Sequence, residues 1–415
     1  MSQQIRNLYR RIGAADPWAG ACLLLLVGSG LVSHGALAAE WSLAPSFGVG
    51  VDADDNARLS SRTDQEEEIS GFIGSAGLGV NYRSQLYRAN FSPLLISRRY
   101  PNDSDFDDDD QIVNAGVTRN TRNGAIGMKV KFVRDYVRTG ERAGVDFDVE
   151  DPDEIDDNDS GRVGARDRRV KWEVQPSWNF TLSDTSRMQL RVRYLDLDYD
   201  ETSVERLVDY NSTWAQARYS RRLSERNTGV FEIGGLWYDA DEADNDSFSY
   251  GFRAGIQRRL SAKTSFEILG GAGTSERAEG GNSSNYLARV NVVRRLETIR
   301  LLAQYKRTVN GTGSGTLTSR DQINLSARRQ LSELLSAALG VVAYRTSSIE
   351  DDVDFDERTY VQLRSQFGWR LTRTLNLEAN YRYTLINRED DDESANSNAI
   401  TVWLRYRPNP TTILR

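Results

Sequence analysis

The fold is decided by residues 170–182, which read VKWEVQPSWNFTL. Apolar or aromatic side chains occupy every even position of this stretch, and polar side chains occupy every odd position. Because successive side chains of a β-strand point to opposite faces, one face is apolar and the other polar. A long strand with tryptophan on one face and formal charge on the other is typical of a transmembrane barrel, with lipid outside and water inside.

The same alternation recurs near the C-terminus, in residues 361–371 and 375–385. The chain has 415 residues, 39% of them hydrophobic, and a mean hydropathy of −0.58. This polarity excludes a helical membrane protein but suits a barrel, since half of each barrel strand faces water. The sequence therefore predicts an all-β fold, a transmembrane antiparallel up-and-down β-barrel.

The N-terminus has the features of an export signal. Arg6, Arg10 and Arg11 precede an apolar run over residues 19–32, and the small residues at 36–38 offer a cleavage site. We expect residues 1–38 to be a cleaved signal peptide and residues 39–415 to form the barrel. The signal has a net charge of +2, from three arginines and one aspartate, so the mature charge falls from −7 to −9.

The mature chain would contain neither cysteine nor histidine, because Cys22 and His34 both lie in the signal. Disulfides, zinc sites of the Cys or His type and imidazole catalysis are then excluded. No particular carboxylate pair stands out for catalysis, and no basic groove interleaved with aromatic residues indicates nucleic-acid binding. The sequence predicts no enzyme, no metal site and no cofactor.

Short turns and longer acidic loops alternate along the chain. Six turns begin with leucine followed by Ser, Thr or Glu, at Leu182, Leu223, Leu260, Leu296, Leu331 and Leu371. At the opposite end of the predicted strands, the connecting loops are acidic, for example residues 101–110, PNDSDFDDDD. Short turns are periplasmic and long loops extracellular in bacterial outer-membrane barrels. Counting a strand on each side gives about eighteen, with sixteen and twenty as neighbouring even numbers.

Aromatic residues sit where a barrel needs interfacial girdles. Trp172, Trp178, Trp237 and Trp369 occupy strand positions near the expected membrane surfaces, where an amphipathic ring is stable. We expect these residues to face lipid and to anchor the barrel.

The inward face is rich in arginine. Reading each strand by its alternation places eight arginines in the lumen. They are Arg191, Arg193, Arg253, Arg289, Arg300, Arg328, Arg364 and Arg382. Guanidinium groups suit carboxylates and phosphates, so these residues could form a path for an anionic solute. The alternative is that inward Arg and Glu cross-link neighbouring strands.

One loop is much longer than the others. Residues 138–166 contain an acidic stretch flanked by arginines. One hypothesis is that the loop folds into the lumen and constricts it with Asp151, Asp153, Glu154, Asp156 and Asp157. The alternative is a solvated acidic loop at the cell surface. Divalent cations at such acidic loops could bridge to lipopolysaccharide phosphates.

Four short segments of the chain carry a family resemblance. They are Trp41-Ser-Leu-Ala-Pro45, Asp54-Asp-Asn-Ala-Arg-Leu59, Gly79-Val-Asn-Tyr82 and Ser97-Arg-Arg-Tyr100. They resemble the opening hairpin of outer-membrane barrels associated with exopolysaccharide and PEP-CTERM/exosortase gene clusters, some classed as β-barrel porin type 2. Ala53 stands where an aromatic is common in that family, and the chain continues beyond the aromatic of its last strand, Tyr406. The resemblance implies a role in polysaccharide secretion at the outer membrane.

The sequence thus leaves three functions open. The first is a channel for export or passage of a polar, anionic polysaccharide, working with outer-membrane lipid, lipopolysaccharide and periplasmic export machinery. The second is a general anion-preferring diffusion porin. The third is a closed structural or adhesive barrel.

Overall fold

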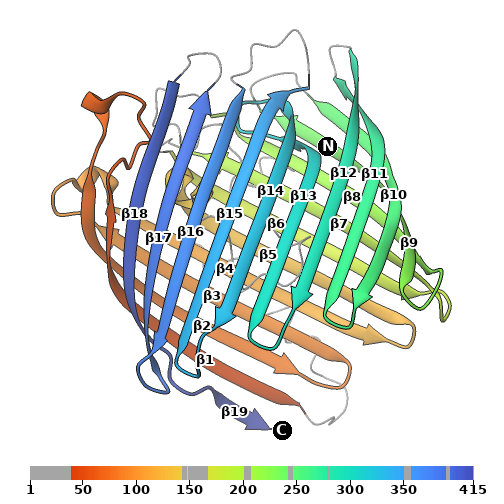
Figure 1. Cartoon of the computed structure of the whole chain (residues 1–415), viewed down its shortest axis with the longest axis horizontal. Coiled ribbons are helices and arrows are strands. Elements are labelled where there is room, and N and C mark those ends of the chain that lie inside the picture. The colour runs from red at the N-terminus through yellow and green to blue at the C-terminus, as the bar shows by residue number, and fades with distance from the viewer. Residues whose placement is uncertain are drawn as a thin grey trace, which may run out of the picture.

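The chain forms one closed antiparallel β-barrel of eighteen strands (Figure 1). This computed structural model describes residues 39–142, 147, 167–200, 207–241, 246–277, 281–349, 357–388 and 393–414. The barrel strands are β1 (Glu40–Asp54), β2 (Ile69–Arg83), β3 (Tyr87–Arg99), β4 (Asp108–Thr121), β5 (Gly124–Tyr136), β6 (Arg168–Thr181), β7 (Ser186–Tyr199), β8 (Tyr210–Arg222), β9 (Asn227–Ala240), β10 (Ser247–Ser261), β11 (Thr264–Arg277), β12 (Asn282–Arg295), β13 (Ile299–Gly311), β14 (Leu317–Gln330), β15 (Leu335–Ser348), β16 (Arg358–Arg370), β17 (Leu375–Arg388) and β18 (Glu393–Tyr406).

Each strand pairs with its neighbour in sequence, and β1 closes the barrel by pairing with β18 from Phe47 opposite Tyr406 to Asp54 opposite Ala399. The predicted fold class and the predicted number of strands are confirmed. A short strand, β19 (Thr411–Leu414), follows Pro408 and Pro410 and pairs with the first residues of β1. It lies below the last barrel strand in Figure 1. The chain beyond Tyr406 therefore extends the sheet and leaves the barrel closure intact.

In five of the six leucine-led turns, all except the one at Leu296, a hydroxyl group accepts a hydrogen bond from the turn backbone. In the turn before β15 the Ser332 hydroxyl accepts a hydrogen bond from the backbone N–H of Leu335 at 3.1 Å. The Thr372 hydroxyl does the same for Leu375 before β17, at 3.0 Å. Ser and Thr are frequent in such turns because their side chains can satisfy a backbone donor locally.

The barrel exterior is apolar. The four tryptophans predicted to face lipid, at 172, 178, 237 and 369, all occupy outward positions, and Trp237 and Trp369 are 49% and 43% exposed. Large exposed side chains continue this band, among them Phe47, Phe72, Leu95, Phe231, Ile233, Phe252, Leu339 and Ile400. Only a helix or a closed barrel satisfies every backbone group within lipid. The closed barrel with an apolar outer face therefore has the architecture of a transmembrane barrel.

The described parts of the loops contain three short helices: η1 (Thr63–Gln65), η2 (Ser104–Phe106) and α3 (Val137–Glu141). Among the described residues, no helix has the length and the apolar character needed to cross a membrane. The predicted signal peptide, residues 1–38, lies outside the described residues.

Candidate functional site

The strand register places all eight arginines of the predicted solute path on the luminal face. Two pairs lie directly opposite each other on neighbouring strands, Arg300 with Arg328 and Arg364 with Arg382. Like charges in directly opposed positions destabilise a sheet unless counter-charges are near. The lumen therefore concentrates positive charge at positions where strand stability alone disfavours it.

Two of the eight arginines belong to a buried ion-pair network centred on Glu232. Arg253 Nε lies 3.1 Å from Glu232 Oε2, and Arg289 donates to Glu232 Oε1 at 3.1 Å. Arg218, on β8, also pairs with Glu232 and reaches Glu267 on β11. These contacts join β8 to β12, so Arg253 and Arg289 brace neighbouring strands, as the second interpretation of the inward charges predicts.

A chain of amides continues this network around the wall. Asn291 donates to Glu267 Oε1 at 3.4 Å, Gln304 donates to Asn291 Oδ1 at 3.0 Å, and Asn324 donates to Gln304 Oε1 at 3.0 Å. The polar contacts thus extend from β8 to β14. Buried polar groups linked in this way hold a single geometry, because each lost partner leaves a desolvated donor or acceptor.

Arg191 and Arg193, both inward on β7, are in a different position. Neither makes a hydrogen bond, an ion pair or a ring contact with another described residue. Arg193 lies directly opposite Trp214, which also faces the lumen. Of the sequence-predicted arginines, these two are the clearest candidates to meet a solute, since their donors are not committed to a neighbouring strand.

The start of the long loop crosses the lumen. After α3, Arg142 reaches the opposite wall, where its backbone carbonyl accepts hydrogen bonds from Gln362 at 3.0 Å and from Arg382 at 3.4 Å. Its guanidinium lies 3.4 Å from Asp54, to which Arg382 also donates at 3.1 Å. Phe147 lies beneath Arg364, with 5.5 Å between the guanidinium carbon and the ring centroid. The loop therefore narrows the lumen beside two predicted path arginines.

Arg142 is 1% exposed, and its Nε and Nη2 have no hydrogen-bond partner. Burial lowers the pKa of Arg142 to about 9, and the neighbouring Asp54 opposes that shift. The group remains protonated at neutral pH. A buried cation with two unsatisfied donors favours the approach of an anion or of water.

The five acidic residues of the constriction hypothesis, Asp151, Asp153, Glu154, Asp156 and Asp157, lie outside the described residues. Within the described part of the loop, Arg142 and Phe147 reach the far wall, whereas Arg138 and Glu141 pair with the luminal residues Asp108 and Arg169. Sequence reasoning missed Arg142 and Phe147 because it concentrated on the acidic run that follows them. The arginines flanking that run were the only signal in the sequence.

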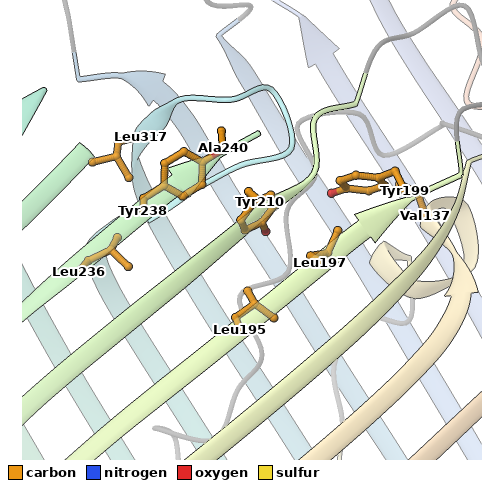
Figure 2. Close-up of a cluster of buried hydrophobic side chains, with 9 residues drawn as sticks. All are labelled: Val137, Leu195, Leu197, Tyr199, Tyr210, Leu236, Tyr238, Ala240 and Leu317. Carbon is orange, nitrogen blue, oxygen red and sulfur yellow. The ribbon is translucent and has the colours of Figure 1, made fainter. Parts of the chain in front are cut away.

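The segment after β13 also turns into the lumen, where it contacts the segment before β8 and the end of β9. Tyr238 donates from its hydroxyl to the carbonyl of Thr312 at 2.6 Å, and Val208 N–H donates to Gly313 at 2.7 Å. Around Tyr238 lies a luminal apolar cluster drawn in Figure 2, formed by Val137, Leu195, Leu197, Tyr199, Tyr210, Leu236, Tyr238, Ala240 and Leu317. Its members come from α3 and from the wall strands β7, β8, β9 and β14. Apolar burial thus fixes loops against the inside of the barrel near its extracellular mouth.

The acidic run over residues 103–107 binds its own backbone. Asp103 accepts from the N–H of Asp105 at 3.1 Å, and Asp107 accepts from the N–H of Tyr100 at 2.7 Å. Across the ranges that the structure describes, no group of three or more His, Cys, Asp or Glu residues could hold a metal ion.

No family model and no curated protein sequence matches the chain. Solved structures with a similar fold include OpdO of Pseudomonas aeruginosa (11% identity, TM-score 0.46, covering 90% of this chain and 97% of that chain). OccAB4 of Acinetobacter baumannii gives 8% identity, a TM-score of 0.46 and coverage of 90% and 98%. The outer membrane channel DcaP of A. baumannii has 13% sequence identity and a TM-score of 0.43, and the match covers 90% of this chain and 99% of that chain. The resemblance to exopolysaccharide-associated barrels finds no support among these matches.

Proposed function

We propose that the chain is a diffusion channel that admits small solutes and prefers anions. The observation that carries this proposal is a wall of five consecutive strands, β12–β16, whose inward positions include Arg and Lys but no Asp or Glu. The cationic residues of this wall are Arg289, Arg295, Arg300, Lys306, Arg320, Arg328, Arg358, Arg364 and Arg370. Charges that line a pore set which ions enter it.

Most luminal carboxylates of the other strands already pair with arginines outside this wall, although Glu232 also pairs with Arg289 of the wall. Asp108 pairs with Arg98 and Arg138, and Asp135 pairs with Arg169. Asp54, Glu232 and Glu378 are likewise held by Arg382, Arg253 and Arg405, respectively. The inward face of β12–β16 is therefore predominantly cationic.

The inward loop favours small solutes over a polymer. Arg142 and Phe147 lie against the far wall, so they reduce the width that is open to a solute. A guanidinium fork suits carboxylate and phosphate groups, and Arg191, Arg193 and Arg142 have donors without described partners. Passage of an acidic polysaccharide would use the same charges but needs a wider and continuous opening, so it is the less supported candidate.

The test is the reversal potential of the refolded mature protein in a planar bilayer under a potassium chloride gradient. We expect anion-selective steps, and R191Q/R193Q should reduce the chloride to potassium permeability ratio several-fold. The matched control is Arg134→Gln, which removes an arginine from the outer surface. Cation selectivity in the wild type would overturn the proposal, and silence of a verifiably folded barrel would favour the closed structural barrel. Block by acidic oligosaccharides but not by small anions would instead favour the polymer channel.

A further inference from the structure

The outer surface of the barrel has a cationic site at the extracellular end of β5 and β6. Arg134 and Arg168 both occupy outward positions there, one on each strand. Arg134 lies opposite Val170 and Tyr136 lies opposite Arg168, so the two arginines are diagonal neighbours. Such positions are about 7–8 Å apart, a distance that two long side chains bridge easily. We call Arg134 and Arg168 the outer cationic pair.

The depth of this pair is set by the aromatic residues just below it. Phe132 is the next outward residue toward the periplasm below Arg134, and Trp172 follows Val170 below Arg168. The ring centroids of Phe132 and Trp172 are 4.7 Å apart. Aromatic rings of this kind mark the boundary between hydrocarbon and headgroups. The outer cationic pair therefore lies at the level of the lipid headgroups of the extracellular leaflet.

Arg134 keeps its guanidinium donors free, whereas the Arg168 guanidinium is partly engaged and its Nε is buried. Arg168 lies over the ring of Tyr136 at 5.5 Å and donates to the carbonyl of Asp109 at 3.1 Å, but its Nε has no partner. Arg134 makes no hydrogen bond, ion pair or ring contact with another described residue. Arg168 interacts electrostatically with the Asp109 carboxylate, which Arg99 binds directly. Neither arginine of the pair forms an ion pair with a described carboxylate.

Other outward arginines near this end are already neutralised. Arg99 donates to both oxygens of Asp109 at 2.9 Å. Arg307 pairs with Asp321 and lies 4.1 Å above the ring of Tyr286. The contrast shows that the fold can supply a carboxylate to an outward arginine and does not do so for the outer cationic pair.

We propose that the outer cationic pair binds the phosphate groups of a phosphorylated glycolipid in the outer leaflet. The aromatic pair below would contact the acyl chains, and the two guanidinium groups would each donate to phosphate oxygens. The protein needs such a site because its net charge is negative and its long loops are acidic, so an anionic leaflet would otherwise be repelled. This inference stands independently of the proposed channel function.

The test measures binding of a bisphosphorylated lipid A and of its dephosphorylated form to the full-length protein in zwitterionic detergent, by native mass spectrometry. We expect a preference for the phosphorylated lipid. R134Q/R168Q should weaken that binding roughly 30-fold, since each basic residue near an anionic lipid surface contributes a factor of about 5. R134K/R168K should keep most of it. The matched control is Arg329→Gln, an outward arginine at the periplasmic end of β14.

Equal binding of both lipids, or unchanged binding by R134Q/R168Q, would overturn the proposal. Heat-modifiable electrophoretic mobility confirms that each variant is folded. The reversal potential of R134Q/R168Q should match the wild type, because both residues face away from the lumen. A shifted reversal potential would contradict the outward placement, whereas failure of the anion preference in the wild type leaves the lipid site intact.

Discussion

Glu232 is the group whose removal should damage the barrel most selectively. Its carboxylate is 2% exposed and contacts three arginines, Arg218, Arg253 and Arg289, whose side chains are 17%, 10% and 10% exposed. The substitution Glu232→Gln keeps the shape of the side chain and removes only the negative charge. Three desolvated guanidinium groups would then face one another around a neutral amide, with Glu267 as the nearest remaining carboxylate.

The magnitude follows from the burial of the network. Removing one partner of a buried ion pair costs about 3–5 kcal/mol, because the other charge stays buried and uncompensated. Contacts of Arg218 with Glu267 relieve part of this cost, so we expect E232Q to lower the free energy of unfolding by about 3 kcal/mol. Glu378 provides the matched control. It pairs with Arg405 at 2.7 Å and with Arg407 at 3.6 Å, but those arginines are 27% and 56% exposed, so E378Q should cost at most about 1 kcal/mol.

The assay is reversible urea unfolding of each variant in lipid vesicles, followed by tryptophan fluorescence, with the slope of the transition compared between variants. In a planar bilayer, E232Q should be more anion-selective than the wild type, because the variant lacks one luminal negative charge. Equal losses of stability in E232Q and E378Q would refute the reasoning, since they would show that the Glu232 network is as well solvated as the ion pairs of Glu378.

Further substitutions test the loop, the exterior and the packing. Phe147→Ala and Arg142→Gln should raise single-channel conductance, because both residues lie across the lumen; unchanged conductance would show that they do not limit it. Trp178→Asp should impair insertion by about 1–4 kcal/mol depending on depth, seen as lost heat-modifiable mobility, and normal folding would contradict its outward facing. Gly311→Ala should cost about 1–3 kcal/mol in urea titrations, since its methyl group would lie 2.1 Å from the ring of Tyr238. Gly270→Ala, with open space around it, should be neutral.

Much of the fold could be predicted from local pattern. The strand predicted over residues 170–182 is β6, Arg168–Thr181, and those predicted to begin at residues 361 and 375 are β16 and β17. The facing of each strand follows from the same pattern, because it depends only on whether a position is odd or even. This is why residues as far apart as Arg191 and Arg382 could be placed on the luminal face without a structure.

The pattern changes meaning where a strand rises above the membrane. On β7 the luminal face carries Arg191 and Arg193 and then Leu195 and Leu197, while Asp196 faces outward. At that height the exterior meets water, and the interior is covered by loops, so apolar residues become favourable inside. The sequence reading of a polar lumen therefore fails near the extracellular mouth.

The sequence by itself determined the strands, their facing, their number and the cationic character of the lumen, because alternation and turn spacing are local properties of the chain. Only the tertiary structure decided which luminal groups meet. Arg142 reaches Asp54, 88 residues away, and Arg382 reaches the same carboxylate across 328 residues. Such pairings depend on barrel closure and on the path of a loop through the interior, where burial makes one partner for a charge far more favourable than water.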